Sequence, residues 1–299
     1  MFGDRVHDIL HLFEDGQINR RDLVHKLTGY LGSTAAAVAA INAAGLAEAQ
    51  VAQCPAGVQV PENDPAITSQ MLTISGEASP VYIYQSLPAD WATKRTPAVL
   101  VIHENRGLTD YIKDVTRRVA KAGYVAIAVD LLSRQGGTQA FPDANDAGTA
   151  YNRTRPEERR ADSLSALFTI RDQSYVRGDR LGVLGFCAGG GVVWDLALNT
   201  TQLAAAVAYY GNPVPAVADI PRINAPMLCH YGELDRTLTA SLGPVMQALA
   251  TGNKRFEVHV YANANHAFHN DTSPRYDPAA SCDSWAKTLD HFNRYLNRP

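Results

Sequence analysis

The chain has few cysteines and lacks any long, strongly apolar run. The four cysteines, Cys54, Cys187, Cys229 and Cys282, lie far apart and form no CxxC pair, so we expect neither a disulfide framework nor a zinc site. Unpaired thiols suit a reducing compartment, which favours a cytoplasmic location. Because no strongly apolar run reaches the ~18 residues that cross a bilayer, we expect no membrane span.

An excess of charge of either sign is lacking too. The net charge is −3 and the pI is near 6.3, which gives no reason to expect a nucleic acid or an acidic membrane as a partner. The GxGxxG and GxxxxGK[ST] patterns that cradle nucleotide phosphates are absent, as are internal repeats. Apolar residues are plentiful, at 46% of 299 residues, which is enough for a large core in one domain.

Residues 1–65 differ in pattern from the rest of the chain. Apolar spacing predicts one helix over Asp4–Glu14 and a second over Arg20–Tyr30, followed by an alanine-rich stretch and a linker-like stretch up to residue 65. We expect a helical N-terminal extension that packs on the main domain or on a partner subunit. A homo-oligomer formed through this extension is therefore one expected assembly.

The pair Arg20-Arg21 leaves a second interpretation of this segment open. Two arginines ahead of an alanine-rich stretch resemble a twin-arginine export signal, which gives a periplasmic location as the alternative. The region before the arginines is long and has a helical pattern, and Asp22 follows them directly. We therefore favour a structural appendage over a leader.

From residue 66 to residue 299, strand-like apolar runs alternate with helical patterns. We expect strands at 71–75, 81–85, 98–103, 125–131, 181–186, 204–210, 227–231 and 256–261, and helices at 111–122, 156–176, 192–198, 239–251 and 279–296. Two strands in succession, then alternation, predict an α/β domain with a mostly parallel central sheet of about eight strands and helices on both faces.

The segment 181–191 combines an apolar strand-like run with the pattern Gly-x-Cys-x-Gly, and a helix-like run follows directly. This is the form of a nucleophile elbow, with Cys187 where serine usually stands. Gly185 and Gly189 supply the small residues that the crowded strand-to-helix turn requires. The N-terminus of the following helix points at the sulfur, which favours the thiolate.

An acid and a histidine follow the elbow in chain order. Asp235 comes just after one predicted strand and His266 just after the next, which is the order of the α/β-hydrolases. Each residue lies where open α/β sheets place their ligands. We predict that His266 accepts the thiol proton or holds the thiolate as an ion pair, and that Asp235 orients the imidazole.

A fourth candidate, Glu104, follows the strand at 98–103. The same loop in α/β-hydrolases supplies half of the oxyanion hole, so the backbone N–H groups of Asn105 and Ala188 are the expected donors. A carboxylate beside a thiolate is electrostatically unfavourable. Glu104 therefore either takes the thiol proton and moves away, or is paired, with Arg106 as the candidate partner.

Together these segments resemble the dienelactone hydrolase (carboxymethylenebutenolidase) family over about residues 70–297. The resemblance rests on five motifs, which are His103–Gly107, Asp130–Leu132, Gly185–Gly190, Gly232–Asp235 and His266–Asn270. It implies a triad of Cys187, Asp235 and His266, with Glu104 holding the resting thiol and taking its proton when substrate binds. The implied reaction opens an enol-lactone through an acyl-enzyme, without a metal or an organic cofactor.

Substrate-binding residues are expected from the loops. The resemblance implies that arginines bind a substrate carboxylate, with Arg275, Arg106 and Arg134 as candidates. We also expect a long loop over residues 133–155 to cover the site, with Phe141 and Tyr151 lining the pocket.

Three other functions stay open on the sequence. The same scaffold serves general carboxylesterases and peptidases, and a fold that has lost catalysis could serve as a thiol sensor. Residues 1–65 could also be an interaction module.

Overall fold

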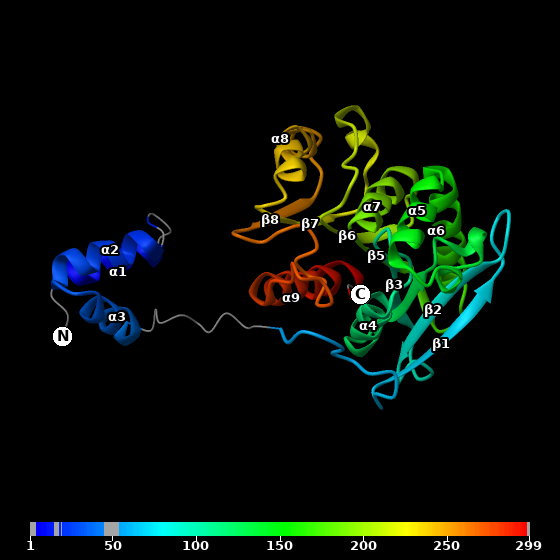
Figure 1. Cartoon of the computed structure of the whole chain (residues 1–299), viewed down its shortest axis with the longest axis horizontal. Helices are drawn as coiled ribbons and strands as arrows, with labels where there is room; N and C mark the ends of the chain where they lie inside the picture. The colour runs from blue at the N-terminus through cyan, green and yellow to red at the C-terminus, as the bar shows by residue number, and fades with distance from the viewer. Residues whose placement is uncertain (1–3, 15–17, 19, 45–53, 298–299) are drawn as a thin grey trace. The chain divides into compact units, whose positions relative to one another are not determined.

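The computed structural model describes residues 4–14, 18, 20–44 and 54–297. The chain divides into two compact units, residues 1–53 and residues 54–299. Figure 1 shows both units with their helices and strands. Within the described residues, no helix is both long enough and apolar enough to cross a bilayer.

The N-terminal unit contains three helices, α1 (Asp4–Glu14), α2 (Arg20–Leu31) and α3 (Thr34–Ala43). The first two confirm the predicted pattern. The third lies in the alanine-rich stretch, where a helix was not predicted, and alanine has the highest intrinsic helix propensity. The helices bury a small apolar core of their own, formed by Val6, Leu10, Leu23, Leu27, Ala37, Ala40 and Ile41.

The larger unit is built on one eight-stranded sheet, as predicted. Its strands are β1 (Ile67–Ile74), β2 (Val81–Pro88), β3 (Thr96–Ile102), β4 (Val125–Val129), β5 (Val176–Phe186), β6 (Leu203–Tyr209), β7 (Met227–Gly232) and β8 (Phe256–Tyr261). The spatial order is β1-β2-β4-β3-β5-β6-β7-β8. β2 pairs antiparallel with β1 and β4, and all other pairs are parallel. β3 and β4 are buried along their whole length, as parallel strands covered on both faces must be.

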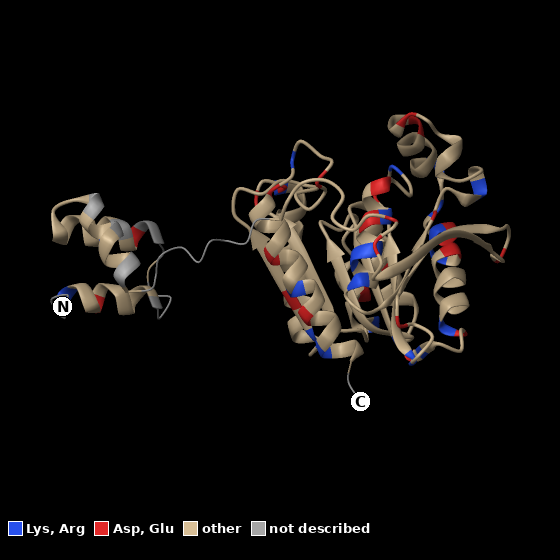
Figure 2. Ribbon diagram, turned by 90° about the horizontal axis from the view of Figure 1, so that it is seen from below, with Lys and Arg blue, Asp and Glu red and all other residues tan. Residues whose placement is uncertain are grey.

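Helices cover both faces of this sheet (Figure 1). One face carries α4 (Asp110–Lys121) and α9 (Pro278–Leu296), and the other carries α6 (Pro156–Arg171), α7 (Ala188–Asn199) and α8 (Arg236–Thr251). Basic and acidic residues are interspersed along these helices (Figure 2). The fold therefore has the three layers expected from the alternating pattern.

The strand order reverses between β3 and β5. The chain leaves β3 to form β4 on one side and returns to form β5 on the other, so β3 and β5 are parallel neighbours. Open α/β sheets bind their ligands in the crevice at such a switch point, beyond the carboxyl ends of the strands. Residues 103–107 and Cys187 follow these two strand ends, which places them at the expected site.

The expectation of unpaired cysteines is wrong for two of them. Cys54 and Cys282 form a disulfide across a sequence separation of 228 residues, whereas Cys187 and Cys229 are free. Spacing carries no signal for a pair that only the tertiary fold brings together. The cysteine argument for a reducing compartment therefore falls, and both the cytoplasmic and the periplasmic locations stay predictions.

The predicted domain boundary at residues 65 and 66 lies too late in the chain. The larger unit begins at Cys54, because the disulfide joins that residue to α9. Val60 is also buried in the core of the larger unit. The linker-like composition of residues 55–65 thus describes an ordered segment.

Residues 133–155 are also more regular than the predicted long loop. They form two short 3-10 turns, Ser133–Gln135 and Thr138–Ala140, and then the helix α5 (Ala144–Arg153). The Asp143 carboxylate caps this helix by accepting a hydrogen bond from the N–H of Asn145 at 2.6 Å.

Candidate active site

The turn at Cys187 has the geometry of a nucleophile elbow. Its backbone has φ 55° and ψ −118°, a conformation that costs free energy for a residue with a side chain. A Cβ on Gly185 would lie 2.3 Å from the carbonyl oxygen of Gly189, and a Cβ on Gly189 would lie 2.4 Å from that of His103. Only glycine fits at both positions, which confirms the predicted reason for this spacing.

The sulfur of Cys187 lies against the two expected oxyanion donors. The backbone N–H groups of Asn105 and Ala188 stabilise the thiolate and lower the pKa of this group. Desolvation and the negative charge of Glu104 have the larger effect and raise the pKa of the thiol to about 11. The predicted preference for thiolate at the helix N-terminus is therefore outweighed, and the resting group is a neutral thiol.

The acid and the histidine meet as predicted. Asp235 follows β7, His266 follows β8, and the Oδ2 of Asp235 lies 2.5 Å from the Nδ1 of His266. The ring of Tyr210 lies beside the imidazole, with 4.9 Å between the ring centroids. Among the residues that the structure describes, His266 makes no hydrogen bond to the thiol.

Glu104 is held by Asn270, a partner that was not predicted. The Nδ2 of Asn270 donates to the Oε2 of Glu104 at 2.7 Å, whereas the predicted pair with Arg106 does not form. Desolvation raises the pKa of Glu104 to about 7, although Asn270 and the charges of Arg106 and Arg275 oppose the rise. A carboxyl group poised near neutral pH can exchange a proton with the thiol.

Buried polar contacts fix the loop that carries Glu104 and Asn105. The Nε2 of His103 accepts the N–H of Leu131 at 2.9 Å, so its Nδ1 carries the proton and donates to the carbonyl oxygen of Glu104 at 2.5 Å. Desolvation lowers the pKa of His103 and keeps it neutral. The N–H of Leu108 also donates to the Oγ1 of Thr138 at 2.7 Å.

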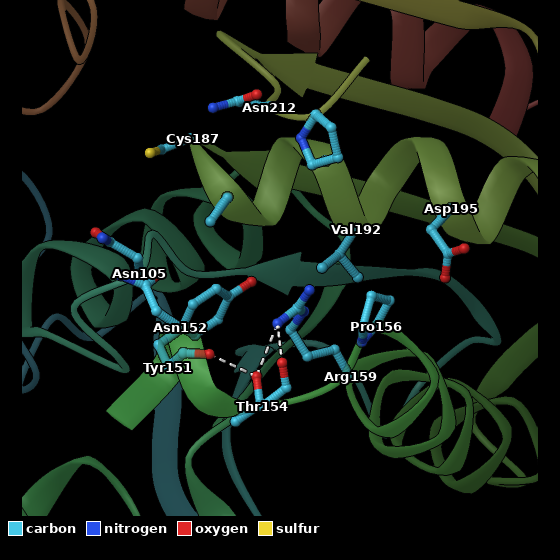
Figure 3. Close-up of a pocket in the computed structure, with 13 residues that line it drawn as sticks. Asn105, Tyr151, Asn152, Thr154, Pro156, Arg159, Cys187, Val192, Asp195 and Asn212 are labelled. Carbon is cyan, nitrogen blue, oxygen red and sulfur yellow. Dashed lines mark hydrogen bonds between the residues drawn. The ribbon is translucent and has the colours of Figure 1, made fainter. Parts of the chain in front are cut away.

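A pocket of about 520 Å³ opens beside Cys187 (Figure 3). Its lining residues are Asn105, Tyr151, Asn152, Thr154, Pro156, Arg159, Cys187, Ala188, Gly191, Val192, Asp195, Asn212 and Pro213. Tyr151 was predicted there and is confirmed. Arg159 was not predicted, because nothing in the local sequence distinguishes it from Arg160, which is not in the lining and pairs with Asp195 at 2.7 Å.

The other residues that we expected to bind substrate do not line this pocket. Arg134 makes a bidentate pair with Asp162 at 2.9 and 2.7 Å, so it is not available to a substrate. Phe141 packs against the core and does not line this pocket. Arg106 and Arg275 are exposed and outside the lining, although both charges act on Glu104.

No group of three or more His, Cys, Asp or Glu side chains among the described residues is arranged to hold a metal ion.

The eight-stranded sheet with its switch point, the elbow and the Asp–His pair define the class of this protein as an α/β-hydrolase. The sequence profile of the dienelactone hydrolase family matches residues 82–296. The chain belongs to this family and is a hydrolase.

Individual relatives agree with this assignment. A putative carboxymethylenebutenolidase of Escherichia coli O157:H7 is 32% identical over 80% of this chain and 90% of its own. A probable 2-oxo-3-(5-oxofuran-2-ylidene)propanoate lactonase of Bradyrhizobium sp is 30% identical over 74% and 92%. The crystal structure of a putative dienelactone hydrolase from Klebsiella pneumoniae superposes with a TM-score of 0.70 at 30% identity, over 77% of this chain and all of that one.

Proposed function

We propose that this protein hydrolyses lactones or small activated esters that carry a carboxylate, through an acyl-enzyme on Cys187. The observation that carries the proposal is the position of the thiol. It stands on a strained elbow, and the N–H groups of Asn105 and Ala188 and the charge of Glu104, a carboxyl group of pKa about 7, act on it. The Asp235–His266 pair follows the ends of β7 and β8 in the same sheet. This set supplies a nucleophile, an oxyanion site and two acid–base groups.

In the proposed first step, the Cys187 thiol gives its proton to the Glu104 carboxylate when substrate enters. The thiolate attacks the lactone carbonyl, and the negative oxygen that develops accepts hydrogen bonds from the N–H groups of Asn105 and Ala188. The C–S bond forms, the ring C–O bond breaks, and the ring oxygen leaves as an enolate.

In the proposed second step, His266 takes a proton from water while the resulting hydroxide attacks the thioester. The C–S bond breaks, the released thiolate recovers its proton from Glu104, and the proton on His266 passes to the enolate oxygen. The sum is one lactone plus one water giving one open-chain acid. Asp235 stabilises the imidazolium that exists between these transfers.

The chemistry of the pocket supports an anionic substrate. The Nη1 of Arg159 donates to the carbonyl oxygen and Oγ1 of Thr154, both at 2.8 Å, and its guanidinium lies 4.9 Å from the ring centroid of Tyr151 (Figure 3). Among the described residues, its Nε and Nη2 have no partner. A fixed guanidinium with donors to spare suits a carboxylate, and the relatives above are named for lactones that carry one.

The test compares a dienelactone that carries a carboxylate with p-nitrophenyl acetate, using wild type, Cys187→Ala and iodoacetamide-treated enzyme. We expect hydrolysis of both substrates to disappear when the thiol is removed or blocked. Activity that survives Cys187→Ala would refute the acyl-enzyme. A preference for p-nitrophenyl acetate would instead indicate a general esterase.

Arg159→Gln tests the anion site. We expect KM for the dienelactone to rise about tenfold, the effect of one lost charged hydrogen bond, with little change for the uncharged ester. Arg153→Gln, on the exposed side of α5, is the matched control. Equal losses on both substrates would show that Arg159 supports the fold and does not recognise charge.

A further inference from the structure

The first residues of the larger unit, 54–60, lie across the back of the loop that carries the catalytic histidine. We call residues 54–60 the strap and residues 266–277 the site loop. Figure 1 shows the strap running past α9 toward α4. The site loop contains His266, Asn270 and Arg275, so its position sets the surroundings of Glu104.

One end of the strap is tied to the far end of the site loop. The N–H of Cys54 donates to the carbonyl oxygen of Pro278 at 3.2 Å, and its sulfur is bonded to Cys282 in the first turns of α9. The hydroxyl of Tyr276 donates to the carbonyl oxygens of Cys54 and Pro55 at 2.6 and 3.2 Å. The strap thus holds Tyr276 by two hydrogen bonds, and the start of α9 by one hydrogen bond and the disulfide.

The other end of the strap reaches the near part of the same loop through buried charges. The carboxylate of Asp114 accepts the N–H groups of Gln59 and Val60 at 3.1 and 2.8 Å, and it also accepts the Nε of Arg118 at 2.9 Å. Arg118 continues to Asp271, whose Oδ2 lies 2.5 Å from its Nη2. Asp114 and Arg118 are almost fully buried, so breaking one contact leaves an unpaired charge.

Asn270 connects this scaffold to the active site. It precedes Asp271, its Oδ1 accepts the N–H and Oγ1 of Thr272 at 3.0 and 2.7 Å, and its Nδ2 donates to Glu104. The amide is therefore oriented on both sides. Its direction toward Glu104 depends on a loop that the strap holds at residues 271 and 276.

We propose that the strap and its disulfide act as positioning elements of the active site, which hold Asn270 against Glu104 through the site loop. The inference rests on the proposed role of Glu104. Releasing the strap lets residues 266–277 move, removes the amide donor from the carboxylate and changes the proton affinity of the group that receives the thiol proton.

The direction of the change follows from the groups around Glu104. Those that face it are Arg106, Tyr111, Cys187, Tyr210, Asn270 and Arg275. Desolvation raises the pKa of Glu104, and the Asn270 hydrogen bond and the Arg275 charge, both supplied by the site loop, lower it. While the carboxyl group stays buried, losing these two interactions raises that pKa. The rising limb of kcat/KM against pH, which requires ionised Glu104, then moves to higher pH.

The experiment uses the full chain as wild type, Cys54→Ser and Cys282→Ser, with Tyr276→Phe as a variant that keeps the disulfide. Mass spectrometry without reductant first shows which samples contain the disulfide. Hydrogen exchange of peptides within 266–277 and the pH profile of ester hydrolysis are then measured. In the variants we expect faster hydrogen exchange in these peptides and a kcat lower than that of wild type by about threefold to tenfold. We expect the rising limb of kcat/KM to lie about half a pH unit to one pH unit higher than in wild type.

Each cysteine variant controls for the other, because both break the same bond. Brief reduction of folded wild type, checked by circular dichroism, replaces them if either fails to fold, and reductant must leave Cys54→Ser unchanged. Unchanged exchange overturns the proposal, and so does faster exchange with an unmoved pH limb. If the Cys187→Ala variant hydrolyses the ester as fast as wild type, only the proposed function is contradicted. The hydrogen-exchange rates of residues 266–277 do not depend on turnover, so they still test the role of the strap.

Discussion

In the proposed mechanism, two carboxyl groups serve the same cysteine from different surroundings. Asp235 follows β7 and is bound to the imidazole of His266 at 2.5 Å. Glu104 follows β3, has a neutral amide as its hydrogen-bond partner at 2.7 Å, and has its pKa raised to about 7. The first carboxylate has an imidazole as its partner, whereas the second can gain or lose a proton near neutral pH.

These surroundings suit the two carboxyl groups to different steps of the proposed reaction. A neutral thiol with a pKa of about 11 needs a base before it can attack, and the charge of Glu104 acts on this thiol. Hydrolysis of the thioester needs a base for water, and His266 has its orienting carboxylate in place. The two pairs would thus act in successive half-reactions, which makes the contribution of each separable by mutation.

The largest expected effect comes from the Asp235–His266 side. His266→Gln removes the base for the second half-reaction, and we expect kcat to fall by about 10²–10⁴. In the proposed mechanism acylation depends on Glu104, so a burst of p-nitrophenol close to one equivalent should survive, followed by almost no turnover. Rapid-mixing absorbance measures both phases. Loss of the burst together with the turnover would show that His266 is needed for attack as well, and the division would be wrong.

Glu104→Gln should reverse this pattern. The amide cannot take the thiol proton, so we expect acylation to slow by about 10²-fold and the burst to disappear. The rising limb of kcat/KM near pH 7 should vanish too, and activity should instead rise toward alkaline pH as the thiol itself ionises. A profile whose limb near pH 7 is retained would mean that another group sets it.

How much of this arrangement was predictable depends on the range of the interactions. Cys187, Asp235, His266 and Glu104 each follow a strand end within a short local motif, so sequence order was enough to place them near one another. Arg159 carries no such signal, because what brings it to the pocket is the packing of α6.

The missed disulfide and the third helix have related explanations. Cys54 and Cys282 are brought together only by the tertiary fold. The alanine-rich stretch has helix propensity but little amphipathic pattern, and the pattern was the signal sought. Asn270 lay within a quoted motif, yet its role depends on a loop whose course no local rule gives.

The pH dependence of folding stability should also distinguish Glu104 from Asp235. The pKa of Glu104 is raised from an ordinary 4.5 to about 7, so between these values the folded state binds the proton that the unfolded state has released. Folding stability from this group is therefore complete below about pH 4.5 and decreases as the pH rises through 7.

Replacing Glu104 with Gln removes that dependence, because Gln stays neutral. At pH 8 we expect the variant to be more stable than wild type by up to about 3 kcal/mol, and near pH 4.5 the two should be equal. Urea unfolding at both pH values measures the difference. Asp235→Asn is the control, since it should show no comparable gain at pH 8. A constant difference between wild type and Glu104→Gln at both pH values would contradict the raised pKa.

The smallest expected effect tests the amide that distinguishes Glu104 from Asp235. Asn270→Asp keeps an oxygen for Thr272 but replaces the donor to Glu104 with a negative charge, so the pKa of Glu104 should rise. We expect the rising limb of kcat/KM to move up by about one unit, with a modest loss at pH 7, and Thr272→Val to move it less. The same limb moves when the strap is released, so Cys54→Ser should add little in the Asn270→Asp background. Additive shifts would mean that the strap reaches Glu104 by another route, of which the Arg275 charge is the nearest candidate.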